Sequence, residues 1–165
     1  MIEINISRTL GRFHLNIEVK SDSKRIGILG ASGCGKSMTL GCIAGIESPD
    51  RGRIVLEGRT LYDRDQKINV KPQKRKIGYL FQNYALFPTM SVRKNIMAGL
   101  KCGKAEQEQI ADKMITKFQL DGLGDRLPGE LSGGQQQRAA LARIMAYEPE
   151  VILLDEPFSA LDEFL

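Results

Sequence analysis

The chain has 165 residues, of which 42% are hydrophobic and 27% are charged, and its formal net charge is +4. This length fits one domain that buries a real core, and the balanced composition argues against a disordered chain. No apolar run approaches the roughly eighteen residues that cross a bilayer, which argues against a membrane-spanning class. Residues 1–7 alternate apolar and polar side chains, which is typical of a strand and not of a secretion signal. We therefore expect a cytosolic protein.

The positive charge is mild and mostly interspersed with acidic residues. Its one dense run is residues 71–76, which we interpret as a solvated turn before a strand and not as a nucleic-acid patch. The three cysteines, Cys34, Cys42 and Cys102, show no metal-ligand spacing and are expected to be reduced thiols. We assign no catalytic role to Cys34, and we expect no nucleic-acid partner.

The first third of the chain predicts strands and one helix. Residues 13–19 alternate apolar and polar side chains, and residues 52–58 form a strand that is closed by glycines. Between them, residues 25–30 predict a buried strand that leads into a glycine-rich loop. Residues 38–46 then have the apolar density of a core helix, which we expect to end before Pro49.

The rest of the chain predicts two further buried strands with helices between them. The strands are residues 76–81 and 151–154, and a helical pattern covers residues 91–121. A second helix is expected over residues 132–146. Strands that alternate with helices indicate an α/β protein with a parallel sheet, whose loops gather at the carboxyl edge.

A phosphate-binding loop is the strongest chemical signal. Residues 30–37 fit the pattern G-x-x-x-x-G-K-[ST] between a predicted strand and a predicted helix. Glycines let backbone N–H groups turn toward phosphates, and the helix adds the positive end of its dipole. Lys36 would reach the β- and γ-phosphates of a nucleotide, and the Ser37 hydroxyl would bind Mg²⁺. The alternative is an incidental glycine-rich turn. The candidate ATP-binding residues are Gly30, Ala31, Ser32, Gly33, Cys34, Gly35, Lys36, Ser37 and Thr39.

Two adjacent carboxylates follow the last predicted strand. Asp155 comes directly after four aliphatic residues, and Glu156 is next. In a chain with a phosphate loop, we expect Asp155 to hold Mg²⁺, through water, and Glu156 to orient or deprotonate an attacking water. Without that loop, an Asp–Glu pair after an apolar run would often be only a solvated strand end.

A second short motif lies at residues 131–135, which read Leu-Ser-Gly-Gly-Gln, and is called the signature motif below. Together with the phosphate loop, Gln82 at a strand end, the carboxylates 155–156 and Ser-Ala-Leu-Asp at 159–162, it resembles the ATP-binding cassette (ABC) ATPases over nearly the whole chain. The resemblance implies a P-loop NTPase fold of the RecA-like type. That fold has a parallel sheet core, an N-terminal antiparallel β subdomain and an inserted helical subdomain.

The resemblance also implies domain boundaries. Residues 1–165 would be one partial ABC ATPase domain. Within it, residues 1–85 and 136–165 would form the β subdomain and the RecA-like core. Residues 86–135 would form the helical subdomain, which carries the signature motif.

In that family two subunits pack head to tail, so that each signature motif closes over the nucleotide of the other subunit. A serine and bare N–H groups at a helix start can hold an anion in this way. The resemblance assigns Asp162 to the link between the two nucleotide sites. It assigns the contact with the partner's nucleotide to Ser132, Gly133, Gly134 and Gln135.

The resemblance makes Gln82 a catalytic residue beside Glu156, because the matching family residue touches the attacking water. It also places Gln82 with Ser37 and Asp155 as the residues around Mg²⁺. The implied cofactors are therefore ATP and Mg²⁺.

The segment after Gln82 resembles the importer branch of the family, in which the helical subdomain receives a helix of an integral-membrane subunit. Tyr84 and Phe87 are expected in that socket, since exposed aromatic side chains are otherwise costly. The alternative is that both pack inside the helical subdomain. Residues 9–11 and 74–79 most resemble the molybdate importer ATPases. The sulfate, spermidine and iron importer ATPases are similar to much of the same sequence.

Two features depart from the family pattern. Phe13 is the candidate for the aromatic residue that stacks on adenine, but it shares a strand face with Leu15, where a core role is equally expected. The family's γ-phosphate histidine follows the region of Asp162 after further strands, whereas the chain stops at Leu165 and His14 comes too early. We therefore expect an N-terminal portion of a longer subunit, with the ATP-binding residues present and little hydrolytic activity alone.

The sequence thus predicts the ATP-binding subunit of an ABC importer, an ATPase that couples MgATP hydrolysis to the uptake of molybdate or another oxyanion. The expected partners are ATP, a second ATPase subunit and an integral-membrane subunit. The expected location is the cytoplasmic face of the cell membrane, as a peripheral protein. Two alternatives stay open: a non-transport ABC ATPase, and a nucleotide-binding fragment without hydrolytic activity alone.

Overall fold

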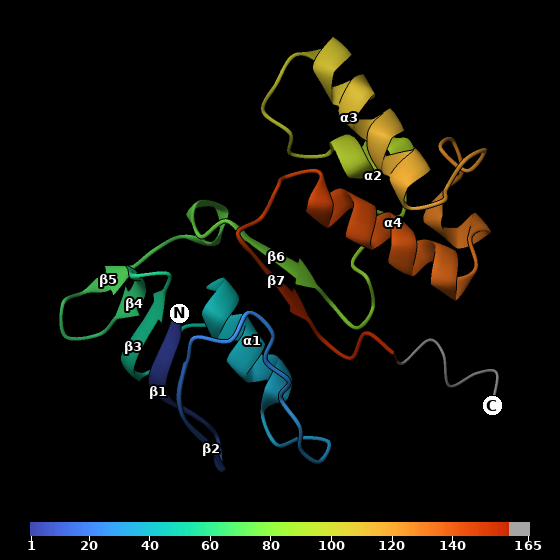
Figure 1. Cartoon of the computed structure of the whole chain (residues 1–165). Helices are drawn as coiled ribbons and strands as arrows, with labels where there is room; N and C mark the ends of the chain where they lie inside the picture. Colours follow the sequence, from blue (N-terminus) through green and yellow to red (C-terminus); the bar gives the residue numbers. More distant parts are fainter. Residues whose placement is uncertain (159–165) are drawn as a thin grey trace. The chain divides into compact units, whose positions relative to one another are not determined.

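The computed structural model describes residues 1–158. The chain divides into two compact units, residues 1–77 and a second unit that begins at Gly78 (Figure 1). Each unit has its own secondary structure.

The first unit is built on an antiparallel sheet. Its strands lie in the order β2-β1-β3-β4-β5, and each neighbouring pair is antiparallel. In the register of β1 and β2, Ile4 lies opposite Val19 and Ile6 opposite Ile17, so alternate apolar side chains share one face. The strands are β1 (Ile2–Leu10), β2 (Phe13–Ser21), β3 (Arg51–Leu56), β4 (Arg59–Asp63) and β5 (Ile68–Asn69).

Helix α1 (Lys36–Ala44) follows the glycine-rich loop, as predicted. Residues 39–44 of the helix are all buried. Gly45 ends it with a left-handed backbone, φ 81°, and its N–H group donates to the carbonyl of Cys42. Only glycine adopts this conformation without a steric cost, so the helix stops before the predicted boundary at Pro49.

A buried arginine holds the carboxyl end of α1. Arg75 is fully buried, and its Nη1 donates to the carbonyls of Cys42 and Ile43 at 2.8 and 2.7 Å. Its Nε donates to the Val70 carbonyl at 2.7 Å. The interpretation of residues 71–76 as a wholly solvated turn is therefore wrong for Arg75. The last carbonyls of a helix have no hydrogen-bond partner within the helix. Here the guanidinium group of Arg75 donates to two of them.

Residues 25–30 form no strand, contrary to the prediction. They carry no regular secondary structure, and Ile26, Ile28 and Leu29 are exposed, Leu29 at 96%. A strand forms only where its N–H and C=O groups pair with a neighbour, and no described strand pairs with this segment. The apolar pattern indicated burial, but a pattern along the chain does not supply a pairing partner.

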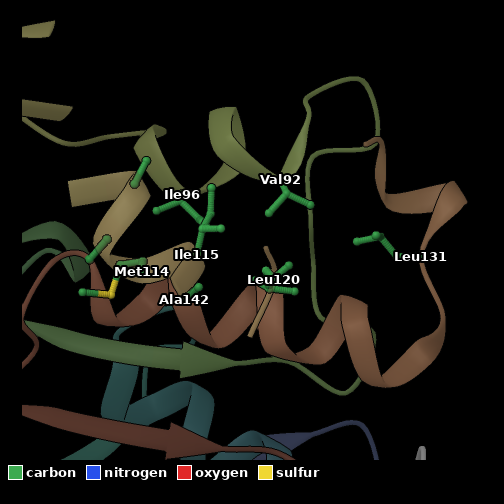
Figure 2. Packing of buried hydrophobic residues seen from close by; sticks show 10 residues of the cluster. Val92, Ile96, Met114, Ile115, Leu120, Leu131 and Ala142 are labelled. Atoms are coloured by element: carbon green, nitrogen blue, oxygen red, sulfur yellow. The ribbon is translucent and has the colours of Figure 1, made fainter. Parts of the chain in front are cut away.

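The described residues of the second unit include three α-helices that pack around an apolar cluster. They are α2 (Val92–Met97), α3 (Lys104–Lys117) and α4 (Gly133–Met145). Figure 2 shows side chains of α2, α3 and α4 meeting between the helices, with Leu120 and Leu131 beside them. The buried members are Val92, Ile96, Ala111, Met114, Ile115, Leu120, Leu131, Ala139, Ala142 and Ala146.

The helical pattern predicted over residues 91–121 is two helices and not one. The chain turns after Ala98, where Gly99 adopts φ 90°, and Gly103 starts α3. Two glycines within five residues favour such a break because they carry the largest backbone entropy cost in a helix.

Strands β6 (Ile77–Leu80) and β7 (Val151–Leu154) form a two-stranded sheet, and their arrows run in the same direction in Figure 1. The N–H group of Asp155 donates to the carbonyl of Leu80 at 3.0 Å and extends the pairing past β7. Ala140 and Ile144 of α4 pack against Leu80. The predicted bounds of β7 are confirmed, and those of β6 to within a residue at each end.

Strand β7 is less buried than predicted. Leu153 is buried, but Ile152 and Leu154 are about two-fifths exposed, at 40% and 45%. Side chains alternate between the two faces of a strand, so this burial pattern indicates that one face of β7 is covered among the described residues. Residues 1–158 also contain two short 3₁₀ turns, η1 (Pro72–Lys74) and η2 (Pro128–Glu130).

Within residues 1–158 the longest helix, α3, has 14 residues, and no helix has the length and apolar character that a membrane crossing requires.

Replacing Arg75 with methionine is expected to lower the free energy of unfolding by about 3 kcal/mol, because several buried carbonyls lose their donors at once. Urea denaturation followed by circular dichroism measures this change. Lys74→Met is the matched control, since Lys74 is exposed in the same basic run, and it should change stability by less than about 0.5 kcal/mol. Equal stability of the two variants would contradict the role given to Arg75.

Candidate functional site

The glycine-rich loop has the backbone of a phosphate cradle. Gly33 and Gly35 adopt left-handed conformations, φ 78° and 97°, immediately before α1. Gly35 is the N-cap of α1, and no side chain caps the helix there. The Lys36 ammonium donates to the carbonyls of Gly30 and Ala31, both at 3.0 Å. The loop therefore folds around its own lysine, at the positive end of a helix.

Strand β2 packs against this loop at Gly35. A Cβ atom at Gly35 would lie 2.7 Å from Leu15 Cδ1 and 3.0 Å from Phe13 Cζ. Phe13 is therefore half-buried beside the loop, on the strand face of Leu15. His14 is exposed and bonds to the Thr9 hydroxyl. Contact of Phe13 with adenine stays a prediction.

Thr39 braces the loop from within α1. Its side chain is buried, and its hydroxyl donates to the carbonyl of Gly35 at 2.9 Å. The remaining predicted loop residues are exposed: Gly30, Ala31, Ser32, Gly33, Cys34 and Ser37.

The two carboxylates after β7 have different surroundings. Asp155 is buried, and one of its oxygens, Oδ2, accepts a hydrogen bond from the Tyr79 hydroxyl at 3.0 Å. Glu156 is exposed, and its Oε2 accepts from Gln82 Nε2 at 2.8 Å. The structure thus brings the predicted pair Gln82 and Glu156 together at the ends of β6 and β7.

Glu156 is held in a conformation that costs energy. Its φ is 48°, in the left-handed region that side-chain-bearing residues rarely adopt. Gln137 of α4 donates to the carbonyl of Pro157 at 2.6 Å and so ties down the next residue. Such strain gathers at functional segments that the surrounding structure holds in place.

Tyr79 is a residue that the sequence reasoning missed. Burial, and then the hydrogen bond and negative charge of Asp155, raise the pKa of its hydroxyl, so that it stays a donor. The available signal was a polar hydroxyl within an otherwise apolar strand, three residues before Gln82.

The signature motif begins α4 through a reciprocal cap. The Ser132 Oγ accepts from the N–H group of Gln135 at 3.3 Å, and Gln135 Oε1 accepts from the N–H group of Ser132 at 2.9 Å. Ser132, Gly133 and Gly134 are exposed. The motif is therefore a helix cap and also an exposed helix start that an anion can approach. Asp162 lies outside the described residues.

The loop after Gln82, residues 83–91, is held by Asn95 of α2. This side chain is fully buried, and its Oδ1 accepts from the N–H group of Phe87 at 2.8 Å. Its Nδ2 donates to the carbonyls of Phe87, Met90 and Ser91 at 2.9 to 3.2 Å. The side-chain amide of Asn95 thus fixes the loop backbone at Phe87, Met90 and Ser91.

Arg143, in the last turn of α4, holds the other part of this loop. It donates to the carbonyls of Tyr84 and Ala85 at 3.1 and 2.8 Å. These two residues have left-handed backbones, φ 60° and 45°, and therefore need such support. The guanidinium also lies 5.4 Å from the centre of the Phe87 ring. Burial lowers the pKa of Arg143, yet a guanidinium remains charged at neutral pH.

The two aromatic residues of this loop differ. Tyr84 is half-buried and packs against the small cluster of Leu80, Ala140 and Ile144. Phe87 is 46% exposed, and Met90 close to it in the chain is 37% exposed. Phe87 is therefore exposed, as expected. Tyr84 instead packs against neighbouring side chains, as in the alternative interpretation.

Comparison with known proteins defines the class to which this fold and these motifs belong. A family model described as ABC transporter matches residues 14–159. The chain belongs to this family, and the resemblance read from its motifs is confirmed.

Curated proteins similar to the chain include several that are named import ATP-binding proteins. A probable sulfate/thiosulfate import ATP-binding protein of Chlorella vulgaris is 47% identical over 96% of the chain and 67% of its own length. The sulfate/thiosulfate import ATP-binding protein of Synechocystis is 45% identical, and the chain covers 44% of it. The molybdenum import ATP-binding protein of Escherichia coli K12 is 42% identical, and the chain covers 46% of it. The chain thus spans less than half of the last two.

Two solved structures share the fold, each with a TM-score of 0.79. One is a dimeric ATP-binding cassette in a post-hydrolysis state bound to ADP and Pi, which is 26% identical over 97% of this chain and 75% of that chain. The other is a dimeric bacterial ABC transporter cassette, 28% identical over 99% of this chain and 77% of that chain. The predicted P-loop NTPase fold class is therefore confirmed.

Replacing Asn95 with leucine is expected to loosen the loop of residues 83–91, because three carbonyls and one N–H group lose their buried partner. We expect a loss of about 2–4 kcal/mol in unfolding free energy and faster hydrogen exchange at the Phe87 amide. Hydrogen-exchange mass spectrometry and urea denaturation measure both effects. Asn83→Leu, at an exposed asparagine of the same loop, should change neither, and matching behaviour of the two variants would refute the role of Asn95.

Proposed function

We propose that this chain is the ATP-binding part of an ABC importer subunit and that it binds ATP at residues 30–37. One observation supports this most strongly: the Lys36 ammonium sits within a loop of left-handed glycines, at the start of a helix that no side chain caps. The loop carbonyls hold the ammonium until a phosphate offers a stronger, charged acceptor. The loop N–H groups and the helix dipole favour the same anion.

Magnesium fits the chemistry of the proposed donors. Among the described residues no group of three or more His, Cys, Asp or Glu side chains is gathered for a metal. Mg²⁺, however, keeps several waters and needs only one or two protein oxygens beside the phosphates. We propose that Ser37, Gln82 and Asp155 hold it by their hydroxyl, amide and carboxylate oxygens, in the case of Asp155 through water. When bound, the ion would neutralise charge that develops on the phosphates.

We propose that Glu156 orients the water that attacks the γ-phosphate and accepts its proton. Gln82 already holds one carboxylate oxygen of Glu156, which fixes the direction of the other. The Glu156 carboxylate is exposed, so a water molecule can reach it, and its backbone is held in a strained conformation, as is common at functional sites.

We further propose that two copies of the subunit pack head to tail. The exposed helix start at Ser132, Gly133 and Gly134, with Gln135 in the cap, would bind the nucleotide of the partner copy. Asp162 would link the two sites. The dimeric state of the similar solved cassettes supports this proposal.

The loop of residues 83–91 is the proposed contact with an integral-membrane subunit. It exposes Phe87 and Met90 on a backbone that Asn95 and Arg143 hold in place, so a partner helix would meet a preformed apolar surface. This contact would place the protein at the cytoplasmic face of the membrane, as a peripheral subunit.

The names of the relatives support an oxyanion as the transported solute. Both sulfate/thiosulfate and molybdenum import proteins are among them, at 42–48% identity. We therefore propose an oxyanion of this kind, with molybdate as one member of the class.

Turnover of MgATP by the wild-type chain and by Glu156→Gln tests the proposed ATPase. We expect ATP affinity to be unchanged and phosphate release to fall at least about a hundredfold, since a general base contributes about 10²–10⁴. Phosphate release and fluorescent-nucleotide titration measure the two quantities.

The exposed carboxylate of Glu148 offers a control, and Glu148→Gln should leave turnover unchanged. Equal turnover by wild type and Glu156→Gln would remove Glu156 from the mechanism. ATP binding without turnover by the wild type would limit the proposal to nucleotide binding.

A further inference from the structure

We propose that Tyr79 is a positioning residue for the metal site: its hydroxyl fixes the orientation of the Asp155 carboxylate. This inference rests on the proposed function, in which Asp155 acts toward Mg²⁺. Its basis is the 3.0 Å hydrogen bond from the Tyr79 hydroxyl to Asp155 Oδ2, at a carboxylate that is only 8% exposed.

The backbone of Asp155 is already fixed by the sheet. Its N–H group pairs with the carbonyl of Leu80, so the β6–β7 pairing continues to this residue. The orientation of the carboxylate then depends on the rotation of the Asp155 side chain. The hydrogen bond from Tyr79 to Oδ2 restricts that rotation, because turning the carboxylate would break it.

Tyr79 is itself well anchored. It lies on β6, between Gly78 and Leu80, which are both buried, and its ring packs on Phe81 with ring centres 4.4 Å apart. A rigid ring that ends in a single donor can transmit the geometry of β6 to a carboxylate on the neighbouring strand. Groups that orient a metal ligand in this way commonly affect metal affinity about 10- to 100-fold.

The purely structural alternative is that Tyr79 only satisfies a buried carboxylate. The two interpretations differ in what the hydroxyl affects. A positioning residue changes how strongly the metal enhances nucleotide binding. A structural residue changes the stability of the fold and leaves that enhancement as it was.

Tyr79→Phe removes the hydroxyl and keeps the ring against Phe81. The measurement is the Kd of a fluorescent ATP analogue with Mg²⁺ and in EDTA, and the ratio of the two gives the enhancement by metal. We expect the enhancement to fall about tenfold in Tyr79→Phe, with the Kd in EDTA unchanged. The paramagnetic resonance spectrum of the Mn²⁺–ATP complex should change in the same variant.

Tyr147→Phe is the matched control. Its hydroxyl also donates one hydrogen bond, to the Ala98 carbonyl, and it touches neither carboxylate. It should leave the enhancement by metal and the Mn²⁺ spectrum unchanged. In an Asp155→Asn background, Tyr79→Phe should have no further effect on the enhancement, because the oriented group is already gone.

An unchanged enhancement and an unchanged Mn²⁺ spectrum in Tyr79→Phe would overturn the inference, while metal-assisted ATP binding by the wild type would leave the proposed function standing. An equal fall in Tyr147→Phe would overturn it as well. If the folded wild-type chain bound no ATP, the proposed function would fail and this inference with it.

Discussion

Charged side chains that leave water must find partners within the protein, and this constraint organises both units of the chain. In the first unit the Arg75 guanidinium takes the free carbonyls of α1, and the Lys36 ammonium takes carbonyls of the glycine-rich loop. In the second unit Asp155 is held by Tyr79, and Arg143 by the carbonyls of Tyr84 and Ala85. Each charge is thereby also fixed in position, which is what a binding site requires.

Backbone strain follows the same logic in the second unit. Three of the left-handed side-chain-bearing residues of this unit, Tyr84, Ala85 and Glu156, lie in the two segments to which we assign contact with partner and water, whereas Gln119 and Glu148 lie outside them. Both segments are tied to α4, the first through Arg143 and the second through Gln137. The helix that starts with the signature motif therefore also supports the other two functional segments of its unit. A change in the position of this helix would therefore shift both the loop of residues 83–91 and the segment at Glu156.

The elements that could be predicted from the sequence are those that depend on residues close together in the chain. The glycine-rich loop, the helix after it, the helix that begins at the signature motif and the bounds of β7 each depend on residues within a few positions of one another. Family membership followed from the order of such motifs. A choice between sulfate/thiosulfate import and molybdenum import did not follow, since relatives with either name are similar to the chain, at 47% and 42% identity.

The parts that the sequence did not predict depend on pairing between distant residues. Residues 25–30 have the apolar pattern of a strand but no strand beside them among the described residues. Arg75 bonds to residues more than thirty positions away, and Tyr79 to a carboxylate 76 positions away. Arg143 reaches a loop 58 positions earlier. A single sequence offers no periodicity from which such contacts can be read.

The central claim is that the loop of residues 30–37 binds the phosphates of ATP through Lys36. Isothermal titration of MgATP into the wild-type chain, Lys36→Ala and Lys101→Ala tests it most directly, because both substitutions remove a lysine and Lys101 is an exposed lysine outside the loop. We expect saturable binding by the wild type and by Lys101→Ala, and a loss of affinity of at least about a hundredfold in Lys36→Ala, as expected when a charged hydrogen bond to phosphate is removed. Equal affinity of Lys36→Ala and the wild type, with all three proteins folded, would contradict it.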